Sequence, residues 1–264
     1  MRTARCELRS ILLIYMFAVC LAGCSSFSRK ASEHEELAAM ADARMVLLTL
    51  GNQNHTLKNF KGIGKIQAWQ KGEKRIDERI AWIGSETVKI SIVVLISGHP
   101  AIKIASDGKW LYYYEVRQGE PLYKKIPATD ATLQRIVSVP IKPIDVITLL
   151  AGRTPLREHH SALLRRQDSG PGYVLILKKR WYGIVEKIYL AEDKKQVRQI
   201  EFLNRSGSLI YRARFDEMQA VDKYQVPLRL SISRDDGMGF RLEVQKYWVD
   251  VPVTRSMFVL EPPN

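Results

Sequence analysis

The sequence predicts a mainly β protein with a few helices, in which one antiparallel sheet curls into a closed or half-closed barrel. Two observations lead to this fold class. From Leu57 onward, hydrophobic residues recur mostly at every second position, which is typical of half-buried strands. Turn-forming clusters such as Asp107-Gly108 and Asn204-Arg205-Ser206-Gly207 separate the alternating segments, as in a chain of hairpins. So many hairpins in one sheet must curl, because a flat sheet of that width leaves long edges.

The expected strands fall into two groups. About six precede the middle of the chain, and the clearest of them runs from Val88 to Ile96, where every second residue is valine or isoleucine. Five or six more follow after Arg157. The expected ranges are 62–70, 75–83, 88–96, 102–104, 110–116 and 122–126, then 173–177, 184–190, 197–203, 209–215, 226–232 and 240–244.

A helix is expected ahead of the strands, from Ser32 to Leu50. Ser32 and Glu35 have the spacing of a capping box, and Gly51 supplies a stop. The apolar residues of this segment recur at helical intervals. We expect this stripe to pack on the strands, and contact with a membrane is the alternative.

Two short helices are expected in the middle of the chain, at Thr129–Val139 and Pro143–Ala151. Pro143 suits the first turn of a helix, and Gly152 suits its C-terminal stop. Because they have no second sheet to cover, we expect both helices at the mouth of the barrel. The apolar residues that recur along them at helical spacing are Leu133, Ile136, Val137, Ile144, Ile147 and Leu150.

The N-terminus has the features of an export signal that ends in a cysteine. Arg2, Arg5 and Arg9 precede an uncharged apolar run, Ile11 to Leu21, which is too short to span a bilayer. Leu21-Ala22-Gly23-Cys24 then resembles a bacterial lipobox, in which diacylglycerol alkylates the cysteine and cleavage occurs before it. Acyl chains on Cys24 would anchor the protein to a membrane that it does not cross. A plain secretory signal is the alternative.

The rest of the composition fits one exported domain. Cys6 and Cys20 leave with the signal and Cys24 is lipidated, so we expect no disulfide and no thiolate metal site. The net charge is +13, and +11 without the signal, with the basic residues spread along strands. We expect solvated faces and no nucleic acid, and anionic lipid headgroups are the alternative partner. The expected parts are the signal peptide 1–23, a tether 24–31 and a single domain 32–264.

No motif for catalysis or metal binding is present. The five histidines lack the spacing of a zinc site, and neither Gly62-Ile63-Gly64 nor Gly237-Met238-Gly239 has the context of a phosphate-binding loop. No Gly-x-Ser-x-Gly nucleophile elbow occurs. We therefore expect no catalytic residues, no metal and no cofactor, and a periplasmic hydrolase is a distant alternative.

Two segments resemble a known family. The segment from Pro143 to Arg153 is similar to the helix that LolB-like proteins carry in the middle, and the tail from Val251 to Pro263 is similar to the ending of LolA-like proteins. With the lipobox and the two strand meanders, the chain resembles the bacterial LolA/LolB lipoprotein carrier and receptor family. The resemblance implies an unclosed eleven-stranded barrel, helices that form a lid, and an apolar cavity for the acyl chains of lipoproteins. LolB has a protruding loop with an exposed leucine between early strands, where this chain has only Ser97-Gly98-His99-Pro100.

On this basis we expect a lipid-anchored binding protein that holds lipid or lipoprotein acyl chains and takes part in envelope lipoprotein transfer. A periplasmic carrier protein is a further candidate partner. Ser25 follows the lipidated cysteine, and the family's sorting rule then implies the outer membrane, facing the periplasm. The alternative is a structural or assembly lipoprotein whose barrel is a docking surface for another envelope protein. The expected lid residues are Leu133, Ile136, Val137, Ile144, Ile147 and Leu150, and the expected wall residues are Trp82, Ile90, Ile92, Val94, Tyr112 and Tyr114.

Overall fold

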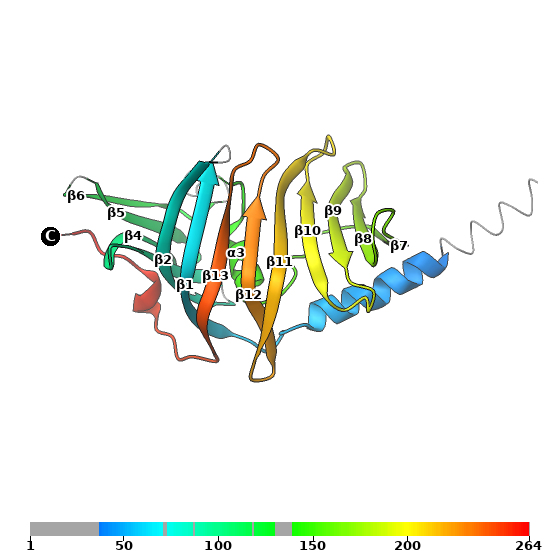
Figure 1. Ribbon diagram of the computed structural model, residues 1–264, viewed down its shortest axis with the longest axis horizontal. Helices are drawn as coiled ribbons and strands as arrows, with labels where there is room; N and C mark the ends of the chain where they lie inside the picture. Colours follow the sequence, from blue (N-terminus) through cyan, green and yellow to red (C-terminus); the bar gives the residue numbers. More distant parts are fainter. Residues whose placement is uncertain (1–36, 71–72, 87, 118, 130–138, 264) are drawn as a thin grey trace, which may run out of the picture.

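One large antiparallel sheet dominates the fold (Figure 1). The computed structural model describes residues 37–263, apart from 71–72, 87, 118 and 130–138. Within this part of the chain there are thirteen strands in the order β6-β5-β4-β3-β2-β1-β13-β12-β11-β10-β9-β8-β7. Consecutive strands pair with one another from β1 to β6 and from β7 to β13, and β1 pairs with β13 near the middle of the sheet.

The strands cover most of the described chain. Their bounds are β1 Asn59–Gln70, β2 Glu73–Ser85, β3 Lys89–Ile96, β4 His99–Ser106, β5 Trp110–Arg117, β6 Glu120–Pro127, β7 Ser161–Arg166, β8 Tyr173–Lys179, β9 Gly183–Leu190, β10 Val197–Leu203, β11 Leu209–Val221, β12 Tyr224–Ser233 and β13 Gly239–Val249.

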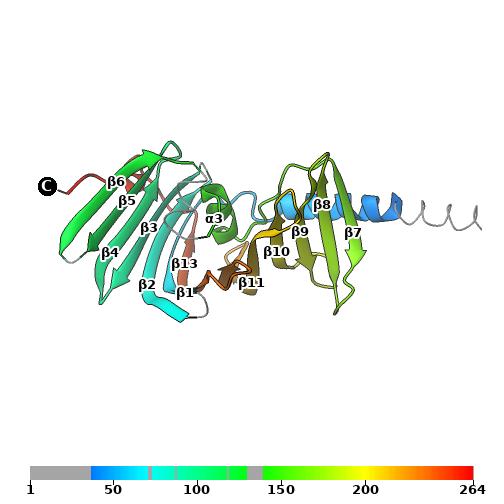
Figure 2. The same cartoon turned by 90° about the horizontal axis from the view of Figure 1, so that it is seen from above.

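The sheet is strongly curved but open. Its two edge strands, β6 and β7, are not neighbours in the described sheet, so the barrel is unclosed. Seen from above, the strands form two halves with α3 (Pro143–Leu150) between them (Figure 2). The predicted fold class is therefore confirmed, in its half-open form. There are more strands than the predicted number of about eleven, and the segment that the sequence ranges omit is β7.

Glycines in β1 allow close packing at the centre of the sheet. A Cβ atom on Gly62 would lie 2.2 Å from the ring of Trp82, which packs directly over this glycine. A Cβ on Gly64 would lie 2.2 Å from the carbonyl oxygen of Glu243, and the pairing of β1 with β13 shifts register at this point. Such irregularities bend a strand and increase its twist. They therefore contribute to the curl of the sheet at its centre.

The N-terminal helix, described over 37–52, lies against the half of the sheet that contains β7 to β11 (Figures 1 and 2). Ala43, Val46 and Leu50 bury the inner side of this helix in the common hydrophobic core. An ion pair of 2.7 Å between Asp42 and Lys194 joins the helix to the β9–β10 turn. The expected packing of the helix on the strands is thus confirmed. Its predicted first turn lies outside the described residues.

The C-terminal tail lies beside the other half of the sheet (Figure 1). Its short 3-10 helix η1 (Arg255–Phe258) packs on β3, and Phe258 is fully buried. Further along, the hydroxyl of Tyr123 on β6 donates a 2.9 Å hydrogen bond to the carbonyl oxygen of Leu260. The tail therefore has a structural role.

The described helices are the N-terminal helix over 37–52, α3 and the 3-10 helix η1. In the part of the chain that the structure describes, none combines the length and the hydrophobicity that a membrane-crossing helix needs.

Candidate ligand-binding cavity

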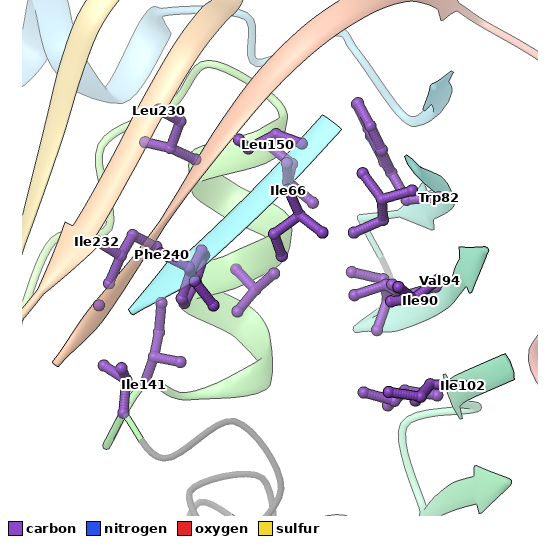
Figure 3. A pocket seen from close by; sticks show the side chains of 18 of the residues that line it. Ile66, Trp82, Ile90, Val94, Ile102, Ile141, Leu150, Leu230, Ile232 and Phe240 are labelled. Atoms are coloured by element: carbon purple, nitrogen blue, oxygen red, sulfur yellow. The ribbon is translucent and has the colours of Figure 1, made fainter. Parts of the chain in front are cut away.

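An apolar cavity of about 310 Å³ lies inside the curl of the sheet (Figure 3). Pockets that hold small-molecule ligands are commonly about 300–1,000 Å³ and mainly apolar. Strands β1 to β5 supply one side of the cavity, β12 and β13 supply another, and α3 with the segment before it supplies a third. The lining residues are Ile66, Ala68, Trp69, Gln70, Ile80, Trp82, Ile90, Ile92, Val94, Ile102, Ile104, Leu111, Tyr113, Val139, Ile141, Pro143, Val146, Leu150, Leu230, Ile232, Met238, Gly239, Phe240 and Leu242.

Five of the predicted site residues lie together on this cavity. Trp82 on β2 lines it beside Ile90, Ile92 and Val94 of β3, whose side chains share one face because strand residues alternate. Leu150 approaches from the end of α3 (Figure 3). The structure thus gathers residues from three of the predicted segments around one space. Their role in binding remains a prediction.

The two predicted tyrosines lie on the other face of β5. Leu111 and Tyr113 line the cavity, so Tyr112 and Tyr114 point away from it. The hydroxyl of Tyr112 donates a 3.3 Å hydrogen bond to Asp107, and the Lys103 ammonium lies 5.4 Å from the ring centre of Tyr114. In this position neither tyrosine can contact a ligand in the cavity.

The three predicted lid residues that the structure describes, Ile144, Ile147 and Leu150, occupy three different environments. Leu133, Ile136 and Val137 lie outside the described residues, as does nearly all of the predicted helix Thr129–Val139. Within α3, Ile147 is only 3% exposed and belongs to the core, whereas Ile144 is 38% exposed on the surface. Neither of these two lines the cavity. The predicted helix Pro143–Ala151 itself is confirmed as α3, with proline in its first turn.

Sequence reasoning missed cavity residues on the closing strands and on α3. The alternation in the sequence shows that these residues share one face of their strands: Leu230 and Ile232 on β12, and Phe240 and Leu242 on β13. The sequence does not show that this face lies opposite β3 and α3 across the cavity. Val146 could not be recognised, because it is one of several apolar residues around a short, mostly buried helix.

The cavity contains few polar groups. The indole Nε1 of Trp82 is buried and has no hydrogen-bond partner in the described part of the chain. A buried donor without an acceptor is costly. The lining also includes Gln70, which is exposed at the end of β1, the indole of Trp69, and Tyr113, whose hydroxyl donates a 2.6 Å hydrogen bond to Glu115. Apolar cavities of this kind stay dry and take up apolar molecules.

The C-terminal end of α3 is fixed by hydrogen bonds to its carbonyl groups. The buried hydroxyl of Tyr247 on β13 donates 2.8 Å to the carbonyl of Leu150, and the amide of Asn54 donates 2.8 Å to that of Ala151. Gly152 follows with a φ of +69°, where a Cβ would lie 2.1 Å from the carbonyl oxygen of Gln225. Glycine is therefore required at the predicted helix stop.

The N-terminal half of α3 is held by a buried charge pair. The guanidinium of Arg157 donates to both carboxylate oxygens of Asp145, at 2.8 and 2.5 Å. The Tyr211 hydroxyl donates a further 2.7 Å bond to Asp145, and the Arg157 guanidinium stacks 4.2 Å from the ring centre of Phe202. Burial, followed by the charge of Asp145, raises the pKa of Tyr211. A bidentate, desolvated pair of this kind is costly to break from one side.

A second acid, Glu186 of β9, is buried beside this pair. It accepts a 2.8 Å hydrogen bond from the backbone N–H of Arg157 through Oε2, while Oε1 has no partner among the described residues. Burial raises the pKa of Glu186 to about 8, against the opposing effects of the Arg157 hydrogen bond and charge. Glu186 is therefore mainly protonated at neutral pH. The sequence carried a signal, because Glu186 is in phase with the inward-facing Ile188 and Leu190.

These contacts hold α3 against the sheet, where it forms one wall of the cavity. Its two ends are tied to the sheet through buried groups on β11 and β13, and the helix contacts β3 and β12 across the curl. Moving α3 would expose the Asp145–Arg157 pair and separate it from Tyr211. The described residues contain no cluster of three or more histidine, cysteine or acidic side chains that could bind a metal.

An unclosed antiparallel barrel with an apolar cavity inside its curl is the architecture on which comparisons with known proteins bear. No protein-family model matches the sequence, and a search of curated proteins finds no match. Solved structures do match. A LolA superfamily protein from Nitrosomonas europaea aligns with a TM-score of 0.56 at 14% identity, over 83% of this chain and 97% of that one. A DUF1329 family protein from Desulfovibrio piger aligns with a TM-score of 0.56 at 10% identity, over 84% and 97%. The chain thus has the LolA-like fold that its sequence resembles.

Proposed function

We propose that this protein binds acyl chains of lipids or lipoproteins in its cavity and passes them on within the bacterial envelope. The observation that carries the proposal is the cavity, which is lined almost entirely by apolar side chains and lies inside a LolA-like fold. The alternative role, a barrel that only docks another protein, requires no interior space. The unfilled cavity therefore favours binding.

The energetics of such binding are those of apolar burial. Each methylene that enters an apolar site contributes about 0.8 kcal/mol, close to what it loses on leaving a bilayer or another carrier. Transfer is then near equilibrium, and its direction depends on small differences in affinity.

Movement of α3 is not part of the proposed mechanism. Because Asp145, Arg157 and Tyr247 hold this helix, we propose that it guides the chain into the cavity as a wall. The lid role of Leu133, Ile136 and Val137 stays a prediction from the sequence.

The proposed location follows from the N-terminus and the fold together. We propose that Cys24 carries the lipid anchor and that Ser25 directs the protein to the outer membrane, where it faces the periplasm. A periplasmic carrier is the proposed protein partner. No enzymatic step is needed, since uptake and release are binding equilibria.

The proposal can be tested by filling the cavity from α3. Val146 lines the cavity, so Val146→Trp places a large ring inside it, whereas Ile144→Trp adds the same ring on the exposed side of the same helix. We expect Val146→Trp to weaken binding of a fluorescent fatty acid at least tenfold. Ile144→Trp should bind like the wild type, with both variants folded by circular dichroism. Unchanged binding by a folded Val146→Trp variant would reject the cavity as the binding site.

A further inference from the structure

The β8–β9 hairpin exposes two aromatic side chains at its tip. Trp181 is 83% exposed, more than any other large hydrophobic residue in the described chain, and its neighbour Tyr182 is 40% exposed. The hairpin lies in the half of the sheet farther from the C-terminal tail (Figure 1). A tryptophan this exposed contributes little to the stability of the fold. Its presence at the surface therefore needs another explanation.

Three consecutive basic residues lead into the tip. Lys178, Lys179 and Arg180 directly precede Trp181, and the Arg180 guanidinium lies 5.5 Å from the centre of the Trp181 ring. Lys179 forms an exposed 2.6 Å ion pair with Glu158. Glu158 is the only acid paired to these three residues in the described chain, so the hairpin tip keeps a positive charge. The whole protein is also positive, with a net charge of +13.

The hairpin holds the aromatic tip in a defined position. The backbone N–H of Tyr182 donates a 3.0 Å hydrogen bond to the carbonyl of Lys179, which closes the turn, and Lys179 pairs with Gly183 in the ladder. Trp181 has a φ of +63°, in the left-handed region that bulky residues rarely occupy. The turn therefore presents a large apolar ring to solvent at the cost of an unfavourable backbone conformation.

We propose that this hairpin tip binds the surface of an anionic membrane. Tryptophan and tyrosine favour the interface between headgroups and acyl chains, because their rings are apolar and carry a polar edge. Lysine and arginine beside them attract anionic phosphates. A protein partner fits this site less well, because stable protein interfaces bury about 800 Å² on each side and a two-residue tip cannot provide that area.

The position of the hairpin is compatible with an anchor at Cys24. The β9–β10 turn contacts the N-terminal helix through the Lys194–Asp42 pair, so the tip lies at the opposite end of β9. Eight strand residues span about 26 Å. The segment 24–36 can reach about 40 Å when extended, so anchor and tip can meet one bilayer. This step rests on the membrane location in the proposed function and is independent of the cavity.

Tryptophan quenching in vesicles can test the hairpin contact. The full chain would be incorporated into vesicles that contain brominated acyl chains, which quench only nearby tryptophans, with either anionic or zwitterionic headgroups. We expect stronger quenching with anionic lipid, and we expect Trp181→Phe to remove this difference. Trp248→Phe is the matched control, because Trp248 is also exposed, at 39%, but lies on β13.

The charge requirement has its own variant, in which Lys178, Lys179 and Arg180 are all replaced by glutamine. We expect at least half of the anionic-specific quenching to disappear, as it should in the wild type at high salt. Equal quenching in the wild type, Trp181→Phe and Trp248→Phe would overturn the proposal, and so would quenching that ignores headgroup charge. Trp69 and Trp82 line the cavity, so brominated chains that enter it should quench them in the Trp181→Phe variant as well. Loss of that remaining quenching would indicate failure of lipid uptake, independently of the hairpin contact.

Discussion

Ile147 distinguishes a moving lid from a fixed wall. Its side chain is 3% exposed within the core cluster, on the same helix as Leu150, which does line the cavity. Full burial of an isoleucine contributes about 1.5–3 kcal/mol, and burying an unpaired carboxylate costs several kcal/mol more. Ile147→Glu should therefore cost about 5 kcal/mol or more, which is the entire stability of many domains.

The assay is thermal unfolding together with fatty-acid binding. For a chain of this size, a loss of 5 kcal/mol lowers the melting temperature by roughly 10–20 °C, so we expect severe destabilisation or no folded protein. Ile144→Glu is the matched control, because Ile144 is 38% exposed in the first turn of the same helix. It should stay within about 0.5 kcal/mol of the wild type. A stable Ile147→Glu protein that no longer binds fatty acid would refute the fixed-wall account and favour a lid.

Three further predictions address the buried charges and the anchor. Glu186→Gln should flatten the pH dependence: the wild-type pKa rises from 4.5 to about 8 on folding, so the unfolded chain ionises first and stability falls by roughly 5 kcal/mol between those pH values. Urea unfolding of both proteins at pH 5 and 9 checks this, and parallel losses would contradict it. Arg157→Met should cost about 3–5 kcal/mol in urea unfolding by stranding Asp145, and Asp145→Asn in the same chain should recover part of it; additive losses would argue against coupling. Cys24→Ala should release the protein from membranes or leave its signal uncleaved, and a processed variant that still fractionates with membranes would disprove the lipobox.

Much of the fold could be predicted because the strands alternate clearly. Alternation identifies β3, where one face is isoleucine and valine and lines the cavity. It fails for β7, where Leu163 and Leu164 are adjacent and both buried, so no period of two is visible.

The side of β5 that faces the cavity could not be predicted, because both of its faces are aromatic or aliphatic. Trp110, Tyr112 and Tyr114 alternate as regularly as Leu111 and Tyr113. Only the tertiary structure distinguishes the two faces of β5. The half of the sheet that contains β5 also packs against η1 and the C-terminal tail, which the strand's own sequence does not reveal. Residues of one β5 face were therefore assigned to the cavity although they lie outside it.

The buried pair of Asp145 and Arg157 was also beyond reach of the sequence. Asp145 is an acidic residue in the first turn of a helix, a common position for exposed acids. Its burial depends on Arg157 and Tyr211, which reach it from a loop and from β11. Pairing across such distances in the chain leaves no local pattern.

The central claim, that the cavity holds acyl chains, is tested most directly by native mass spectrometry of the full chain purified from its own membranes in mild detergent. The account predicts a bound species with the mass of a lipid, released on denaturation and displaced by added fatty acid. Covalent lipid on the N-terminus remains after denaturation and is thereby distinguished. Protein that carries no releasable lipid, and takes up none when lipid is supplied, would contradict the account.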